Sequence, residues 1–259
     1  MDKREQWLQP GERLDDLQLN DLHLIQNPDS FCFGVDAVLL SHFAKVKKGN
    51  RVIDLGTGSG VIPLLLAGRH PHCHITGVEI QADMAQRASR SVAMNGLEDQ
   101  ITIFHQDIRT LQETLPAASF DVVTSNPPYL PVGSLVNPSE TKALARHEIA
   151  LTLHDLMQQT AYLLKPGGHF FLIHRPQRLT DIMILGRQHG LEPKWMQMVH
   201  PYTHKAPTMV MLQLAKNGRP ELKSHPPLII YHPDGTYTPQ LLACYGPKKR
   251  HGDGSPASF

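Results

Sequence analysis

The sequence predicts an α/β protein with a mostly parallel sheet that is covered by helices on both faces. Short apolar runs that read as strands alternate along the chain with longer segments of helical periodicity, and this order requires crossover connections. Turns rich in glycine or proline separate these segments. The chain has 259 residues, of which 41% are hydrophobic and 19% charged, so it can bury a core without disulfides.

The first half of the chain contains four of the expected strands and three of the expected helices. Apolar pairs at helical spacing predict a helix from Asp36 to Val46, and a second helix follows a glycine turn. The third helix stops at Asn95-Gly96, which is a left-handed cap signal. The expected strands are 52–55, 75–79, 101–104 and 122–125, and the expected helices are 36–46, 61–68 and 81–94.

The second half continues the alternation and then changes character. Helices are expected at 153–164 and 179–188, and strands at 169–174, 194–199 and 209–214. Further on, two short apolar runs flank Asp234-Gly235, a strong hairpin signal. We therefore expect an N-terminal cap segment (1–30), a main domain (31–217), a hairpin extension (218–245) and a disordered tail rich in glycine, proline and serine (246–259).

Composition and charge bound the classes of function. Three cysteines and no apolar signal core after Met1 favour a cytoplasmic protein, and no apolar stretch is long enough to span a membrane. The net charge is only +1, but from Lys194 onward eight basic residues stand against three acidic ones. A phosphate-backbone partner requires such a surface, although a merely solvated surface explains it equally well.

A glycine-rich turn and two acidic residues point to a cofactor that contains a ribose. Asp54-Leu55-Gly56-Thr57-Gly58-Ser59-Gly60 follows an apolar strand and precedes a helix, and glycines allow close approach of the backbone to a ligand. Glu79 ends the next strand, where an acid accepts hydrogen bonds from ribose hydroxyls. Asp107 follows the third strand and is placed to face an adenine amine, although it also reads as a helix N-cap.

The motif Asn126-Pro127-Pro128-Tyr129 directly follows the fourth strand and suits the capture of a planar amine. The Asn126 side-chain oxygen and the Pro127 carbonyl can both accept from one NH2 group, and the prolines hold the backbone stiffly. Tyr129 offers a face on which a flat base or amide can stack. Two acceptors on one amine leave its lone pair aimed at an electrophile.

As a set, these motifs resemble those of the class I S-adenosylmethionine-dependent methyltransferases. That resemblance implies a Rossmann-like fold with a seven-stranded sheet whose last strand is antiparallel. It also implies that S-adenosylmethionine is the cofactor, that Asp54 and the glycine turn bracket its methionine part, and that Glu79 and Asp107 take the ribose and the adenine. The predicted cofactor set includes Asp54, Gly56, Thr57, Gly58, Gly60, Glu79, Ile80, Asp107, Ile108 and Asn126.

Within that class, the chain is similar to the tRNA (adenine-N6)-methyltransferases that modify the adenosine beside the anticodon of a valine tRNA. The similarity extends over nearly the whole chain, including the segments 12–17, 26–27, 31–40, 145–148 and 226–231. It implies that Phe33, Gly34 and Asp36 lie against the methionine end of the cofactor. It further implies tRNA as the partner, catalysis by the 126–129 motif and no requirement for a metal. The predicted RNA-binding residues are Arg146, Lys205, Lys216, Arg219 and Lys223.

Several alternatives stay open at the level of sequence. Glutamine-N5 methyltransferases acting on release factors carry the same Asn-Pro-Pro-Tyr motif, but they have a larger helical N-terminal domain. DNA adenine methylation would need a target-recognition region that is not evident here. A methyltransferase-like scaffold that only binds RNA would have no use for the intact motif. The cluster His70-Pro71-His72-Cys73-His74 suggests zinc, but its spacing is too tight for a structural site.

Overall fold

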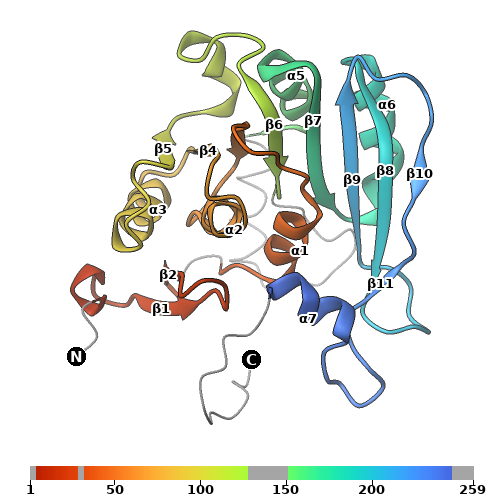
Figure 1. Cartoon of the computed structure of the whole chain (residues 1–259). Coiled ribbons are helices and arrows are strands. Elements are labelled where there is room, and N and C mark those ends of the chain that lie inside the picture. The colour runs from red at the N-terminus through yellow and green to blue at the C-terminus, as the bar shows by residue number, and fades with distance from the viewer. Residues whose placement is uncertain (1–3, 29–31, 128–150, 247–259) are drawn as a thin grey trace.

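The computed structural model describes residues 4–28, 32–127 and 151–246, and its centre is a nine-stranded sheet (Figure 1). The strand order is β10-β8-β9-β7-β6-β3-β4-β5, and β11 also pairs with β8. The strands are β3 (Arg51–Leu55), β4 (His74–Glu79), β5 (Ile101–His105), β6 (Phe120–Ser125), β7 (Leu164–His174), β8 (Leu191–His200), β9 (Met209–Lys216), β10 (Lys223–Ser224) and β11 (Leu228–Ile229).

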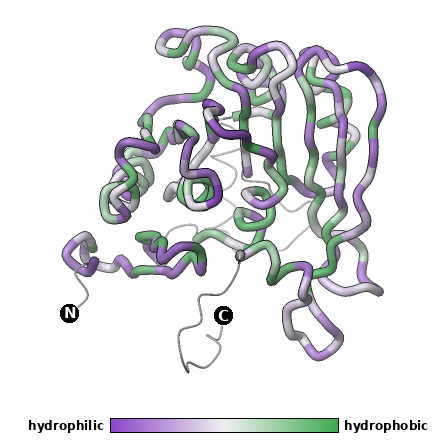
Figure 2. Tube along the Cα trace, in the orientation of Figure 1, coloured by the Kyte–Doolittle hydropathy of each residue, from purple (hydrophilic) through white to green (hydrophobic). Residues whose placement is uncertain are grey.

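The seven predicted strands are confirmed, and so is the antiparallel direction of the last of them. The pairs β3–β4, β4–β5, β3–β6 and β6–β7 are parallel, whereas β9 is antiparallel to both β7 and β8. The structure adds β10 and β11, which pair with the edge strand β8 over two residues each. The segment that carries β10 is largely hydrophilic (Figure 2), so no apolar run marked it in the sequence.

Helices cover both faces of the sheet, as the alternation of segments predicted. One face carries α1 (Val35–Phe43), α2 (Val61–Arg69) and α3 (Ala82–Met94), and their apolar residues share one core cluster. The other face carries α5 (Leu153–Leu163) and α6 (Leu179–Gln188), which pack with the 3-10 helix η2 (Ile108–Glu113) in a second cluster. The described residues include no helix with the length and apolar character of a membrane span.

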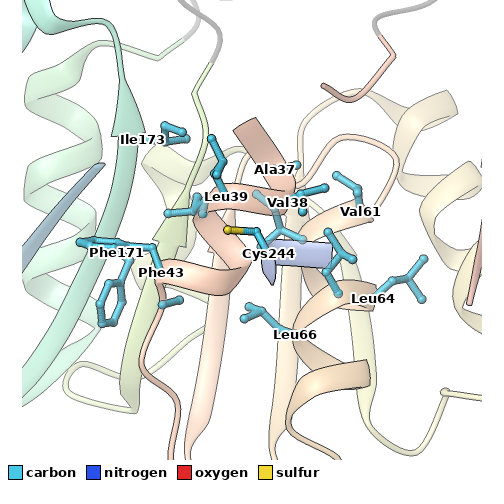
Figure 3. Packing of buried hydrophobic residues seen from close by; sticks show 14 of the residues in the cluster. Ala37, Val38, Leu39, Phe43, Val61, Leu64, Leu66, Phe171, Ile173 and Cys244 are labelled. Atoms are coloured by element: carbon cyan, nitrogen blue, oxygen red, sulfur yellow. The ribbon is translucent and has the colours of Figure 1, made fainter. Parts of the chain in front are cut away.

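Helix α1 is enclosed on several sides. Ala37, Val38, Leu39 and Leu40 are all at most 1% exposed, which is unusual for four consecutive helical residues. Figure 3 shows why: the side chains around α1 come from β7 (Phe171 and Ile173), from α2 and from Cys244 of α7 (Pro239–Tyr245). The position of α1 is therefore fixed by the sheet, by α2 and by α7 together.

The N-terminal segment, predicted only as a cap, is a short β-hairpin that rests on α3. Its strands are β1 (Arg13–Asp16) and β2 (His23–Gln26), and the short helix η1 (Glu5–Trp7) precedes them. The Ile25 amide donates to the Ser91 hydroxyl at 3.1 Å, and the Asn95 side chain both accepts from and donates to the His23 backbone. In Figure 1 the hairpin accordingly lies below α3 and α2.

The C-terminal segment contains the turn predicted at Asp234-Gly235, together with a helix that was not predicted. Tyr231 and Tyr237 form one antiparallel bridge across the turn, and the His232 amide donates to the Thr236 carbonyl at 2.8 Å. The chain then enters α7, where the Thr238 hydroxyl caps the Leu241 amide. The seven residues of α7 are too few to show a helical period, although Thr238-Pro239 is a helix-start signal. The predicted disordered tail lies outside the described residues except for Gly246.

Candidate active site

The predicted site residues follow neighbouring strands at one edge of the sheet. The register pairs Leu55 with Val78 and Glu79 with His105, so the parallel strands end at nearly the same level. Because β6, β3, β4 and β5 are adjacent in that order, Asn126, the glycine turn, Glu79 and Asp107 follow one another along the edge. Neighbouring strands lie about 4.8 Å apart. Ligands of parallel α/β sheets bind at this carboxyl edge.

The glycine turn has the backbone conformation that its residues predicted. Gly56, Gly58 and Gly60 all have positive φ. At Gly60, with φ +88°, a Cβ atom would also approach the Cβ of Ala88 to 3.1 Å, so this position requires glycine for two reasons. The amides of Gly56 and Thr57 both donate to the Val78 carbonyl, which fixes the turn against β4.

Glu79 is buried and is bonded directly to the turn. Its Oε2 accepts from the Gly58 amide and its Oε1 from the Gln81 amide, each at 2.9 Å. The side chain is only 5% exposed at the very end of β4. Its carboxylate therefore occupies a defined position between the turn and the start of α3. Next to it, Ile80 is 40% exposed, which is unusual for a large apolar side chain in this fold.

Asp54 lies beneath the turn and is fully buried. The Thr124 hydroxyl donates to its Oδ1 at 2.7 Å, and burial raises the pKa of Asp54 to about 6. Within the described part of the chain, its Oδ2 and the buried hydroxyl of Thr57 make no short hydrogen bond, although the Thr57 hydroxyl is near enough to the carboxylate to lower the pKa of Asp54 in part. A buried carboxylate oxygen without a partner is costly unless a ligand or water satisfies it.

A contact between Asp36 and Asn126 joins the start of α1 to the end of β6. The Asn126 Nδ2 donates to the Asp36 Oδ2 at 2.9 Å, while the Asp36 Oδ1 accepts from the Ala37 amide at 3.0 Å. With its NH2 group engaged, the Asn126 amide has its oxygen available as an acceptor for another group. Phe33 and Gly34 lie immediately before α1, where Gly34 is the exposed N-cap residue and Phe33 packs against the core.

Asp107 is engaged as a helix cap, the alternative that its sequence context left open. It accepts from the Arg109 amide at 2.9 Å and forms an ion pair with the Arg109 guanidinium, with 2.6 Å between Nη2 and Oδ2. These interactions hold the pKa of Asp107 below its usual value, and Arg109 is the main cause. Its side chain is 24% exposed, and Ile108 behind it is buried.

Gly77 is a site residue that was not predicted from the sequence. A Cβ at this position would approach the Thr57 Cγ2 to 3.0 Å and the Ile103 Cδ1 to 2.8 Å. Gly77 lies beside Asp54 in the sheet register. A glycine inside a strand indicates the close approach of another group, so Gly77 could have been predicted from its place in the apolar run.

The basic residues predicted to bind RNA do not form one patch. Lys205 is exposed beyond the end of β8, at the same edge as Asn126. Lys216 ends β9 at the opposite edge, where its ammonium group donates to the Ala161 and Leu164 carbonyls. Lys223 pairs with Glu221 at 3.1 Å. Because β8 spans ten residues at about 3.3 Å each, roughly 30 Å separates its two ends.

Several predicted residues lie outside the described part of the chain. They are Pro128, Tyr129 and Arg146. Pro127, the last residue described before that gap, is buried.

A cavity of about 490 Å³ lies away from these residues. His42, Lys45, Arg69 and His70 contribute to its lining. They belong to the C-terminal ends of α1 and α2 or follow them, at the edge where β3 and β4 begin. Arg69 is the basic residue in the last turn of α2, where a cation stabilises the helix dipole, whereas burial lowers the pKa of His42 and His70 and favours their neutral form. The His-Cys cluster at 70–74 is nearby, and no group of three potential metal ligands is found among the described residues.

Comparisons with known proteins agree with this geometry. Residues 34–185 match the family model of the methyltransferase small domain. A tRNA1(Val) (adenine(37)-N6)-methyltransferase from Aeromonas hydrophila is 32% identical over 216 residues, which cover 83% of this chain and 88% of the relative. The chain belongs to this methyltransferase family. A relative of the same name from Pedobacter heparinus is 30% identical, and the match covers 78% of this chain and 84% of that protein.

A solved structure supports the fold independently. The crystal structure of a predicted O-methyltransferase from Agrobacterium tumefaciens superposes with a TM-score of 0.68 at 22% sequence identity, covering 81% of this chain and 95% of that one. At this level of identity the likeness concerns the fold alone, which is Rossmann-like. Membership of the tRNA1(Val) methyltransferase family shows that this protein is an enzyme that uses S-adenosylmethionine, and the fold agrees with this conclusion.

Proposed function

We propose that this enzyme methylates N6 of an adenosine in tRNA, and that the adenosine is nucleotide 37 beside the anticodon of a valine tRNA. The observation that carries the proposal is the Asn126 amide, held by Asp36 at the end of β6 beside the glycine turn. The relatives that match over four fifths of the chain bear the name of this activity. Three free cysteines and the absence of a membrane-spanning helix in the described residues support action in the cytoplasm.

The order of the residues along the sheet edge fits S-adenosylmethionine in one orientation, with its methionine part at Asp54 and its adenine toward Asp107. The Oδ2 of Asp54, buried and without a short hydrogen bond, suits the positively charged methionine end. Glu79 lies one strand further along, where it would accept from the ribose, and the exposed Ile80 beside it offers an apolar face for the adenine. Asp107 lies one more strand along, and its carboxylate, which accepts from the Arg109 amide and guanidinium, would exchange one of these contacts for the adenine amine. Phe33 and Gly34 belong to the methionine side.

The target amine would be held on the other side of the glycine turn. Asn126 presents its side-chain oxygen, and we propose that this oxygen and the Pro127 carbonyl accept the two hydrogens of the adenine N6 amine. Pro128 and Tyr129 would complete the motif, with the Tyr129 ring stacked on the base. An unpaired loop adenosine suits this arrangement because little energy is needed to extrude it.

Catalysis by this arrangement depends on orientation. When bound, S-adenosylmethionine supplies a sulfonium methyl group to an in-line nitrogen nucleophile, leaving S-adenosylhomocysteine and releasing one proton to water. Asn126 and Pro127 direct the nitrogen lone pair, and Asp36 prevents the Asn126 amide from turning over. Since no strong base is needed, proximity and orientation provide the rate, and they can supply about 7–11 kcal/mol.

The ionisation of Asp54 gives a pH dependence that can be measured. Because burial raises its pKa to about 6, the free enzyme carries a neutral Asp54 at lower pH. A cationic cofactor favours the ionised form, so its Kd is expected to rise about tenfold for each pH unit below about 6. Isothermal titration calorimetry between pH 5 and 8 measures this slope. Asp54→Asn keeps the acceptor for Thr124 and should remove the dependence; an unchanged slope in that variant would contradict the assignment.

The role of Asp36 is separable from cofactor binding. Asp36→Ala releases the Asn126 amide, and misplacement of about 1 Å at a reacting group costs about 10²-fold in rate. We expect kcat to fall by about tenfold to a hundredfold, with partial rescue in Asp36→Asn, whose side-chain oxygen can still accept. Single-turnover kinetics give the rate and equilibrium titration gives the cofactor Kd. A loss confined to cofactor affinity would show that Asp36 contacts the methionine end and does not position Asn126.

The function itself is tested by incubating the protein with radiolabelled S-adenosylmethionine and total bacterial RNA. After digestion, labelled N6-methyladenosine in the tRNA fraction would support reaction, atom and substrate class together. Parallel incubations contain purified release factor and genomic DNA. Label in either of those and none in RNA would refute tRNA as the substrate and leave the methyltransferase activity standing.

A further inference from the structure

Four aromatic rings form a row beyond the end of β8. The row consists of His204 and Tyr202, from the loop between β8 and β9, and Tyr231 and Tyr237, from the turn that follows β11. Neighbouring ring centroids are 5.7 Å apart for His204 and Tyr202, and 5.4 Å apart for each of the next two pairs. His204 is exposed, and the three tyrosines are half-buried. The rings therefore form a continuous stack with one end in solvent.

This aromatic row lies at the sheet edge that carries the active site. β8 runs parallel to β6 and β7, because β9 is antiparallel to both of its neighbours. The loop after β8 consequently emerges at the carboxyl edge, where Asn126 follows β6. Three strand spacings separate β8 from β6 in the sheet order, which is about 15 Å. Figure 1 shows the loop after β8 and the turn before α7 at the same side of the sheet.

One cation lies directly beside the exposed end of the row. Lys205 is exposed next to His204, and its backbone is fixed because its amide donates to the Tyr202 carbonyl and its carbonyl faces the His200 ring. Asp234, the acid on the neighbouring turn, accepts from the Thr236 amide and hydroxyl and stays ionised. Because Tyr202 and Tyr231 are covered by their neighbours in the row, the loop presents the outer face of the His204 ring beside the Lys205 cation.

A purely structural role accounts for only part of the row. Contact between Tyr202 and Tyr231 joins the C-terminal segment to the loop, and this is sufficient to fix that segment. His204 adds an exposed ring at the far end and buries no core. Alternating aromatic and basic groups are typical of surfaces that stack the bases of single-stranded RNA and follow its backbone.

We propose that His204, the solvent end of the aromatic row, stacks on an unpaired loop base near the target adenosine, with Tyr202 supporting the His204 ring from behind and Lys205 beside the RNA phosphates. The inference rests on the proposed function, since it takes the partner to be an RNA loop whose target base occupies the Asn126 site. Stacking of a loop base on His204 would hold the loop open while the target base is extruded. The surface therefore recognises the loop, and the motif at Asn126 recognises the amine.

The test uses the full-length protein and an anticodon stem-loop RNA in which 2-aminopurine replaces a loop base next to the target adenosine. Stacking of one base is worth about 1–3 kcal/mol, so His204→Ala and Tyr202→Ala are each expected to weaken RNA binding roughly fivefold or more. The quenching of 2-aminopurine on binding should decrease in both variants. Tyr202→Phe keeps the ring and should behave as wild type, and Thr203→Ala is the matched control in the same loop.

The outcomes separate this inference from the proposed function. Wild-type protein is assayed for methyl transfer to the same RNA. If it transfers methyl groups and both alanine variants keep wild-type affinity and quenching, the stacking surface is refuted and the function stands. If it binds and methylates no RNA, the proposed function fails and the inference falls with it. His204 is exposed, so His204→Ala tests the surface even if Tyr202→Ala loosens the C-terminal segment.

Discussion

Asn126→Ala is expected to lower kcat by on the order of 10²–10³-fold, as loss of a preorganised hydrogen-bond partner does in other enzymes. The variant removes the oxygen that orients the amine and also the contact to Asp36 at 2.9 Å. Cofactor affinity should change little, because Glu79, the glycine turn and Asp54 are held by contacts of their own. Methyl transfer to tRNA measured under single-turnover conditions gives the rate, and calorimetry gives the cofactor Kd.

Two comparisons make the Asn126 result specific. Ser125→Ala serves as the matched control, since the Ser125 hydroxyl donates to the Leu55 carbonyl and has no part in holding the amine. This control should keep most of the activity, although the loss of a buried hydrogen bond costs about 1 kcal/mol of stability. Wild-type transfer by Asn126→Ala would refute the mechanism. Loss of cofactor binding in that variant would show that Asn126 belongs to the cofactor site first.

Glu12→Gln is expected to lower the free energy of unfolding by about 3–5 kcal/mol, the usual cost of breaking a buried ion pair. The Glu12 side chain is 3% exposed, and its carboxylate accepts from Arg90 at 2.6 and 2.7 Å and from Arg87 at 3.1 Å. The neutral amide would no longer balance the positive charges of Arg87 and Arg90, which both belong to α3. Urea unfolding at pH 7 measures the difference between the variant and wild type.

The same carboxylate predicts how stability changes in acid. Its hydrogen bonds to Arg90 lower the pKa of Glu12 from 4.5 to about 2 in the folded chain. A depressed pKa contributes stability that is fully present above the unfolded value and is lost as the pH falls from about 4.5 toward 2. The difference between wild type and Glu12→Gln should therefore shrink across this range. Asp15→Asn, in an exposed pair with Arg13, is the control and should cost about 1 kcal/mol or less. A Glu12 effect as small as that of the control would contradict the prediction.

The sequence predicted the elements whose signals are local. The core strands are apolar runs bounded by turns, and the glycine turn is recognisable because positive φ at Gly60 excludes other residues. The sequence left two roles open for Asp107, an acceptor for the adenine amine and a helix N-cap, and the structure shows the N-cap. The β1–β2 hairpin, β10 and α7 escaped prediction because they are short and partly polar, and because tertiary packing stabilises them more than their own periodicity does.

Contacts between distant parts of the chain were beyond prediction from the sequence. Asp36 and Asn126 are ninety positions apart, and no local pattern indicates that the start of α1 meets the end of β6. The basic residues after Lys194 are a second example. Their clustering in the sequence left open whether they share one surface, and in the structure Lys216 donates to two carbonyls at the end of the sheet opposite to Lys205.

The packing of α7 on α1 has a consequence for how the enzyme is made. Leu241 and Cys244 belong to the cluster that encloses α1, whose first turn carries Asp36. During translation α1 emerges early and α7 late, so a nascent chain exposes the apolar residues that α7 will later cover. A chain interrupted before α7 should therefore leave this side of α1 uncovered and be more open to proteolysis than the full chain, which limited proteolysis of the two chains would measure.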